Sequence, residues 1–259
     1  MRFLWALACC CPLLAFEADP RAVAAFGRYA KLTEEAYPRA LWLDDHKHEK
    51  SMVWLNQGFV TEHQTLDHGE EIAAPGGVIQ DWIAETFIPG VTMDRVREVL
   101  LDYANYKDWF KDAVLASRLE KREGDRFEML LRLHRRQISK VVLNVKYAVE
   151  WRPLDETHGS IKAHSTYIGE AKYAKNKPYE EDEPPENEHG FLWRMNMYWR
   201  LEAADNGVYA ELESITLSRD AGRLAAGRVL NGFVDNFPKD FTRYSCEKLR
   251  EMLAPATRK

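Results

Sequence analysis

The chain of 259 residues is too long for a small disulfide-stapled protein and fits one large domain or two small ones. Hydrophobic residues make up 46% and aromatic residues 12%, which is enough for a sizeable core and excludes wholesale disorder. With 36 basic and 41 acidic residues, the net charge of −5 lacks the excess of Lys and Arg typical of nucleic-acid binders. We therefore expect no nucleic-acid partner.

Residues 1–18 have the pattern of a signal peptide. A basic start is followed by an uncharged run over residues 3–16, and the first acid is Glu17. The run is shorter than the ~20 residues of a membrane span but fits the apolar segment of a signal peptide. We expect cleavage after Ala15 or Ala18 and export, either to a periplasm or by secretion. A buried strand or an uncleaved anchor is the alternative interpretation.

Little metal or disulfide chemistry is expected in the mature chain. Cys9, Cys10 and Cys11 lie in the apolar run, so cleavage leaves Cys246 alone and excludes an internal disulfide or a Cys-rich zinc site. A group of acids and histidines lies near a lysine-rich connector: Asp44, Asp45, His46, His48, His63 and His68. No rigid element flanks the connector, so we interpret it as a solvated loop and predict no metal and no cofactor.

Residues 19–77 are predicted to add a helix and a strand to the main domain. Asp19-Pro20 supplies an N-cap and a proline at the first helical position, and apolar residues at helical spacing continue to Tyr37. Residues 52–66 have the composition of a strand. Pro75-Gly76-Gly77 then predicts a turn.

Residues 78–253 are predicted to form the main domain, and residues 254–259 a tail. A helix capped by Thr92 follows the first strand, and the chain ends in one long helix over residues 221–253. Pro238 lies inside this helix, where we expect a kink without a break. The predicted strands cover residues 78–88, 114–122, 126–134, 141–151, 160–170, 191–202 and 208–218.

Alternation along the strands predicts which face of the sheet is buried. The odd positions are apolar in Val141–Trp151 and in Phe191–Glu202, so these faces should point inward. By the same parity, His164 should point outward and Tyr167 inward. The segment Ala204–Gly207 predicts a hairpin, whose two allowed turns place Arg200 opposite either Glu211 or Glu213. We leave this register open.

Several stretches of the main domain carry a family resemblance. They are Val99-Leu100-Leu101-Asp102-Tyr103 with Asn105-Tyr106 and Trp109, Phe191–Arg194, Trp199–Glu202, Gly207–Glu213 and Leu217–Asp220. The chain from about Val78 to Leu253 resembles the START-like (helix-grip, SRPBCC) superfamily. Within it, the chain is most similar to bacterial START-like proteins of unestablished activity and to coenzyme Q-binding-protein-like domains. The resemblance implies an α+β helix-grip fold, in which a curved antiparallel sheet wraps around the long carboxy-terminal helix.

The resemblance also implies a cavity between the sheet and the long helix. Its expected lining is apolar and aromatic, and the alternative is a filled core. The predicted ligand-binding residues are Tyr147, Val149, Tyr167, Trp193, Trp199, Ala210, Phe233 and Phe237.

Charged residues near the hairpin allow two interpretations. The group consists of Arg200, Glu211, Glu213 and Arg219. It could orient a substrate, but we favour an ion-pair ladder across strands, because opposite charges that face each other need no further role. No phosphate loop, nucleophile elbow or dinucleotide fingerprint is present, and we assign no catalytic residue.

These observations predict an exported binder or carrier of a hydrophobic small molecule of lipid or polyprenyl type. The alternative function is an enzyme resembling polyketide cyclases and aromatases, which use the same cavity and need polar side chains inside it. Transient membrane contact is a further expectation, and the oligomeric state is left open.

Overall fold

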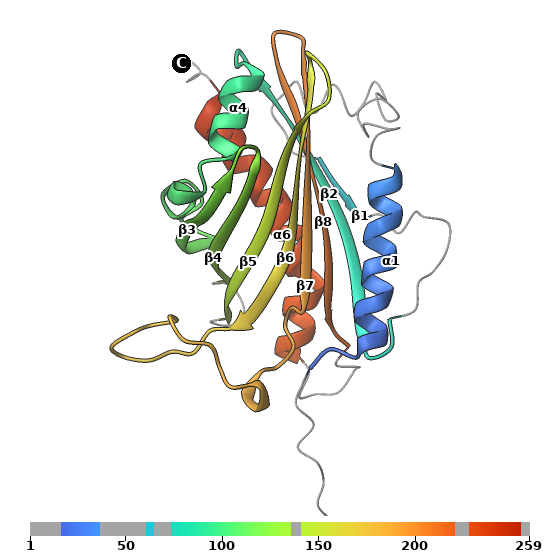
Figure 1. The fold of residues 1–259 in the computed structure, drawn as a ribbon, viewed down its shortest axis with the longest axis vertical. Helices are drawn as coiled ribbons and strands as arrows, with labels where there is room; N and C mark the ends of the chain where they lie inside the picture. Colours follow the sequence, from blue (N-terminus) through green and yellow to red (C-terminus); the bar gives the residue numbers. More distant parts are fainter. Residues whose placement is uncertain (1–16, 37–60, 65–73, 136–140, 221–227, 255–259) are drawn as a thin grey trace, which may run out of the picture.

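The computed structural model describes residues 17–36, 61–64, 74–135, 141–220 and 228–254. The apolar run over residues 3–16 and the connector with Asp44, Asp45, His46 and His48 lie outside the described residues. The described chain forms an antiparallel sheet with helices on both faces (Figure 1).

All pairs of neighbouring strands in the sheet are antiparallel, and the strands follow the order β1-β2-β8-β7-β6-β5-β4-β3. The sheet has eight strands among the described residues. They are β1 (Thr61–Gln64), β2 (Gly77–Pro89), β3 (Val114–Glu123), β4 (Arg126–Arg135), β5 (Val141–Pro153), β6 (His158–Glu170), β7 (Arg194–Ala204) and β8 (Gly207–Arg219).

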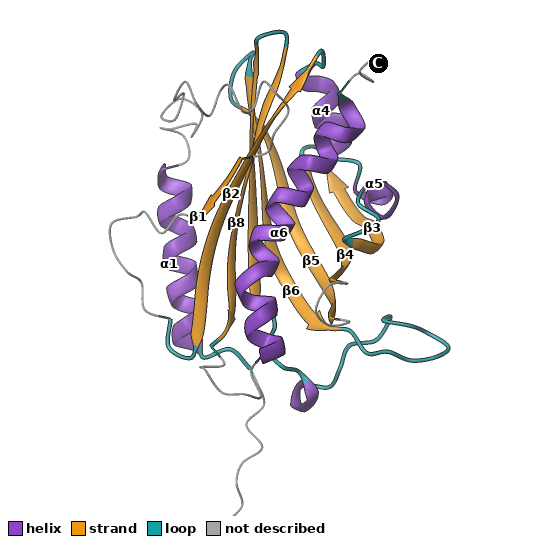
Figure 2. Cartoon of the chain, turned by 180° about the vertical axis from the view of Figure 1, so that it is seen from behind, coloured by secondary structure: helices purple, strands orange, loops and turns teal. Residues whose placement is uncertain are grey.

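The helices divide between the two faces of the sheet. The long helix α6 (Arg228–Leu253) lies across one face, which we call the inner face (Figure 2). The helix α1 (Pro20–Ala36) lies against the outer face near β7 and β8 (Figure 1). The shorter helices are α4 (Met93–Leu100), α5 (Tyr106–Trp109) and the 3-10 turns η1 (Tyr103–Asn105) and η2 (Pro185–Asn187).

Local sequence signals account for several of these boundaries. The Thr92 hydroxyl accepts a hydrogen bond of 3.3 Å from the Arg95 amide, which begins α4 at the predicted cap. The helix α6 continues through Pro238, as predicted. Asp205 and Asn206 form the β7–β8 turn with φ angles of 53° and 56°, the left-handed conformation of a two-residue hairpin. This turn selects the register in which Arg200 pairs with Glu211.

The main core fills the space between the inner face and α6. All the odd positions of Val141–Trp151 lie in it, which confirms the predicted parity of β5. Residues of α4 and of the carboxy-terminal half of α6 join the same cluster, among them Val96, Leu100, Leu249 and Leu253. A second, smaller cluster on the outer face joins α1 to β7 and β8 through Ala22, Phe26, Tyr29, Tyr198, Ile215 and Leu217.

Candidate functional site

An apolar cavity lies between the inner face of the sheet, α6 and the segment from α4 to α5. The sheet contributes Met129, Leu131, Ile161, Met197 and Trp199, among others. The helical segments contribute Leu100, Tyr103, Tyr106, Phe110, Phe241, Tyr244 and Ser245. About 40 Å³ of the cavity is open to the centre of a water molecule, which is room for roughly three waters. A larger ligand therefore requires the walls to move apart.

The wall opposite the sheet is held by hydrogen bonds at its two ends. The Tyr106 hydroxyl donates to the Leu100 carbonyl oxygen over 2.5 Å, which ties α5 to the end of α4. The Tyr244 hydroxyl accepts from the Asp112 amide over 3.3 Å, which ties α6 to the loop before β3. These two contacts connect separate segments, so we expect them to control how far the wall can open.

The described lining of the cavity is uncharged at neutral pH. It consists of aliphatic and aromatic side chains, two methionines and one serine, and the Ser245 hydroxyl donates to the Phe241 carbonyl oxygen over 2.8 Å. Burial raises the pKa of Tyr103 and Tyr106 well above the usual tyrosine value, so both hydroxyls keep their protons. A charged group would enter such a cavity without a counterion, which is strongly unfavourable.

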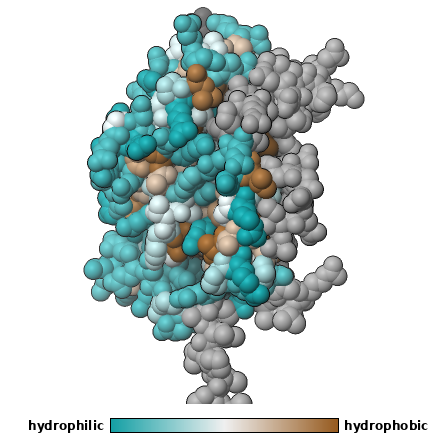
Figure 3. All heavy atoms as spheres, turned by 45° about the vertical axis from the view of Figure 1, so that its right-hand side comes forward, coloured by the Kyte–Doolittle hydropathy of each residue, from teal (hydrophilic) through white to brown (hydrophobic). Residues whose placement is uncertain are grey.

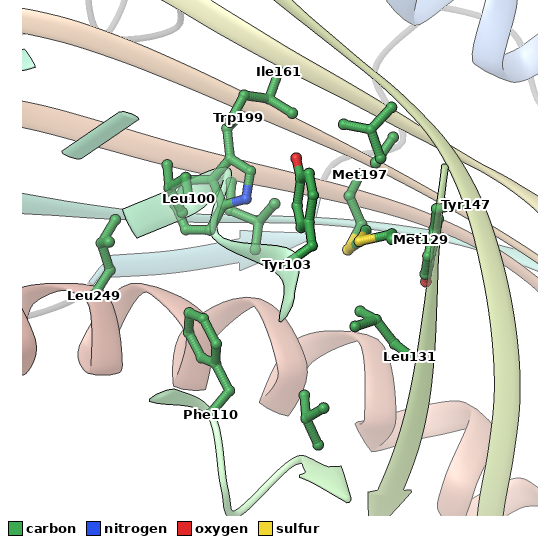
Figure 4. Packing of buried hydrophobic residues seen from close by; sticks show 14 of the residues in the cluster. Leu100, Tyr103, Phe110, Met129, Leu131, Tyr147, Ile161, Met197, Trp199 and Leu249 are labelled. Carbon is green, nitrogen blue, oxygen red and sulfur yellow. The ribbon is translucent and has the colours of Figure 1, made fainter. Parts of the chain in front are cut away.

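One of the predicted ligand-binding residues lines the cavity, and four others lie close to it. Trp199 of β7 is part of the wall. Tyr147, Val149, Ala210 and Phe237 are buried in the same inner core but do not belong to the lining. Figure 4 shows Tyr147 on the far side of Met129 and Met197 from Trp199. Phe233 lies in the part of α6 whose side chains are outside the described residues.

Tyr167 does not line the cavity, contrary to the prediction, because a β-bulge inverts the parity of β6. Lys146 pairs with Tyr167 whereas Tyr147 pairs with Ser165, so Thr166 is an extra residue on β6. After the bulge, Tyr167 points outward, is 42% exposed and donates a hydrogen bond to Asp182 over 2.5 Å. Before the bulge, His164 lies on the outer face, as predicted, within 2.7 Å of Glu34.

Trp193 also lies away from the cavity, contrary to the prediction. It packs against the outer cluster with α1, whereas Met195, Met197, Trp199 and Leu201 lie in the inner core. The strand β7 begins only at Arg194, and Gly190 just before it has a φ of 76°. Strand alternation therefore does not extend back to Trp193.

Sequence reasoning missed most of the wall that faces the sheet. Tyr103, Tyr106 and Phe110 line the cavity from the segment after α4, and Phe241 and Tyr244 line it from α6. The unusual density of aromatic residues between Tyr103 and Phe110 was the available signal. Alternation along strands cannot assign such residues, because they belong to short helices and loops.

The charged residues of the β7–β8 hairpin form a buried ion-pair cluster on the outer face. The Arg200 guanidinium contacts the Glu211 carboxylate directly and lies 2.6 Å from Glu213 Oε2. Burial raises the pKa of Glu211 to about 7, and the Glu213 charge adds to the rise although Arg200 opposes it. These three residues alternate with inward-facing Trp199, Leu201 and Leu212, so they do not project into the cavity. The cyclase-like alternative therefore loses its candidate residues.

The described residues contain neither a cluster of metal ligands nor a membrane-spanning helix. No group of three or more His, Cys, Asp or Glu side chains there could hold a metal ion. None of the described helices combines the length and apolarity that crossing a bilayer requires. The described surface in Figure 3 is mainly hydrophilic, with hydrophobic residues in small separate patches.

Comparisons with known proteins give matches only at the level of structure. No family model and no curated protein matches the sequence. A STAR-related lipid transfer protein from Xanthomonas axonopodis is 16% identical over 74% of this chain and 98% of its own, with a TM-score of 0.48. The Zhui aromatase/cyclase from Streptomyces sp. R1128 is 13% identical over 68% and 93%, with a TM-score of 0.47. The lipid transfer domain of human StarD13 is 10% identical over 76% and 85%, with a TM-score of 0.49.

The arrangement of the described elements decides the fold class. A short helix after the first long strand, a run of antiparallel strands and a long carboxy-terminal helix across the inner face follow one another along the chain. This is the α+β arrangement that the sequence resemblance implies. The described chain thus has the α+β, helix-grip fold.

Proposed function

We propose that this protein binds or carries a hydrophobic small molecule of lipid or polyprenyl type in the inner cavity. The observation that carries the proposal is unfilled space in the core with an uncharged, largely aromatic wall. Ordinary protein cores are packed without voids much larger than a water molecule, so space for several waters at this position is not needed for folding. Apolar walls with few polar groups are typical of small-molecule pockets.

The small volume of the cavity implies that binding requires movement of its wall. The inner face belongs to a continuous sheet, whereas the opposite wall consists of separate helical segments joined by single hydrogen bonds. Displacing Phe241 and Tyr244 together with α6 would widen the cavity without breaking any strand pairing.

The first experiment is extraction of freshly purified protein with organic solvent, followed by mass spectrometry of the extract and native mass spectrometry of the intact protein. We expect a co-purifying apolar compound. Ala163, which is 4% exposed and lines the cavity, offers a filling variant, Ala163→Leu. This variant should retain less compound than the wild type, whereas Ala148→Leu on the exposed outer face should retain as much. Absence of any bound compound and equal behaviour of both variants would contradict the proposal.

We further propose that the protein is exported after cleavage of residues 1–18. The supporting observation is the basic start followed by an uncharged run and an abrupt polar change at Glu17. Mass spectrometry of the protein from its native host should show an amino terminus at residue 16 or residue 19. A chain that retains Met1 would contradict cleavage.

A further inference from the structure

Two neighbouring tyrosines of the cavity wall differ in the hydrogen bonding of their hydroxyl groups. Tyr103 and Tyr106 both line the cavity, and their rings meet edge to face with centroids 5.2 Å apart. The Tyr106 hydroxyl donates to the Leu100 carbonyl oxygen. The Tyr103 hydroxyl has no hydrogen-bond partner among the described residues, although Tyr103 is only 2% exposed.

The Tyr103 hydroxyl contributes nothing to the packing that holds this residue. Its ring contacts Tyr106 and also Phe127, whose ring centroid lies 5.4 Å away, and a phenylalanine would keep both contacts. A buried hydroxyl without a partner destabilises the fold, because it loses its hydrogen bonds to water and gains none. A phenylalanine at this position would therefore give a fold at least as stable.

The Tyr103 hydroxyl faces other side chains of the cavity lining, so a ligand in the cavity could contact it. In Figure 4 it points away from α6 and toward the side chains of Ile161, Met197 and Trp199, all of which line the cavity. Burial raises the pKa of Tyr103 well above its usual value, so the group is a neutral donor at physiological pH. The described lining holds no cation or carboxylate that would bind a charged group.

We propose that the Tyr103 hydroxyl binds the oxygen of a neutral ligand, a hydroxyl or carbonyl group on an otherwise apolar skeleton. This inference rests on the proposed function of the cavity and narrows its ligand class. Pure hydrocarbons leave the hydroxyl unpaired, and carboxylates or phosphates would be buried without a counterion. The ligand is therefore expected to be an alcohol, phenol or ketone that is apolar elsewhere.

The test compares two probes of similar shape, naphthalene and 2-naphthol, by isothermal titration calorimetry with wild-type protein, Tyr103→Phe and Tyr106→Phe. Wild-type protein should bind 2-naphthol about two- to tenfold more tightly than naphthalene, the range expected for one net hydrogen bond. In Tyr103→Phe this ratio should fall to about one, with naphthalene affinity unchanged. Tyr106→Phe, which loses a hydroxyl bonded within the wall, should change the affinity for both probes alike and therefore keep the ratio.

Thermal unfolding without ligand supplies a second, independent measurement. Tyr103→Phe should not lower the Tm, because its hydroxyl has no partner to lose, whereas Tyr106→Phe should lower it. If Tyr103→Phe binds both probes as the wild type does, the hydroxyl is satisfied by water and the inference is overturned, although the cavity still binds ligands. If wild-type protein binds neither probe, the proposed function itself fails, and the inference fails with it.

Discussion

The inner face of the sheet buries uncharged side chains and the outer face buries ion pairs, although the same strands build both faces. Along β7, Met197, Trp199 and Leu201 face the inner core, whereas Tyr198 and Arg200 face outward. The inner face leaves space open between uncharged side chains, and the outer face fills its buried region with ion pairs and α1. Burial alone therefore does not mark a binding site. The uncharged lining distinguishes the inner cavity, because the grooves on the outer face are lined by charged residues such as Glu34 and Lys162.

On the outer face, Glu34 and Asp81 hold α1 against the sheet through ion pairs and hydrogen bonds. Glu34 of α1 lies 2.7 Å from His164 Nε2 and 3.3 Å from Lys162 Nζ, and it accepts a hydrogen bond from Tyr198. Burial alone would raise its pKa, but His164 and Lys162 lower it to about 2. Asp81 accepts a hydrogen bond of 2.9 Å from Tyr29, and burial raises its pKa well above the usual value. These contacts attach α1 to the sheet.

The largest effect should come from Arg200→Met, which breaks the outer ion-pair cluster. Glu211 and Glu213 would lose their buried cation, and such losses typically reduce the free energy of unfolding by about 3–5 kcal/mol. Urea unfolding followed by circular dichroism measures the loss. Arg126→Met is the matched control, because the Arg126 pair with Glu150 is exposed and should contribute less than about 1 kcal/mol. Equal losses in both variants would show that the cluster is not stabilising.

Leu131→Ala tests the inner face, because it should both destabilise the core and enlarge the cavity. Leu131 is 2% exposed and lines the cavity, so its truncation should reduce the free energy of unfolding by about 2–5 kcal/mol. Unlike the change at Arg200, it should also enlarge the cavity and strengthen naphthalene binding. Leu154→Ala, at a site that is 45% exposed, should change stability by less than about 0.5 kcal/mol. Weaker naphthalene binding in folded Leu131→Ala would contradict the assignment of the wall.

The buried Glu211 should make stability depend on pH near neutrality. Its folded-state pKa of about 7 lies above the ordinary 4.5, so the folded state holds the proton more tightly than the unfolded state does. The free energy of unfolding should therefore fall as pH rises from about 4.5 to about 7, on the order of 2 to 3 kcal/mol from this group. Urea titrations at several pH values should show a reduced slope in Glu211→Gln and an unchanged slope in Glu123→Gln, whose side chain is exposed.

The smallest expected effect concerns the attachment of α1. The lowered pKa of Glu34 means that its stabilisation is present above about pH 4.5 and is lost as pH falls toward 2. Glu34→Gln should reduce the free energy of unfolding at pH 7 by about 1 kcal/mol, since the group is partly solvated. The difference from the wild type should disappear in acid. The neighbouring Glu35→Gln should have little effect, because Glu35 pairs only with exposed Lys31 among the described residues. A pH-independent deficit in Glu34→Gln would contradict the ionic attachment.

Regular strands made most of the fold predictable, and irregular backbone limited the prediction of the site. The inward faces of β5 and of β7 from Met195 onward follow from simple alternation, which the structure confirms. The same rule fails for Tyr167 and Trp193, because one follows a bulge and the other precedes its strand. An inserted residue in a strand leaves no mark in the hydrophobic pattern unless the pairing partner is known.

The sequence by itself determined the order of helices and strands, the inward faces of the regular strands and the presence of a hairpin over residues 204–207. These features depend on local preferences and on periodicity, which neighbouring residues encode. Only the tertiary structure decided that the Tyr103–Phe110 segment forms part of the cavity wall, that the hairpin pairs Arg200 with Glu211, and that space remains open inside. Whether apolar side chains fill a core or leave a cavity depends on the distances between elements far apart in the chain, and no local pattern encodes those distances.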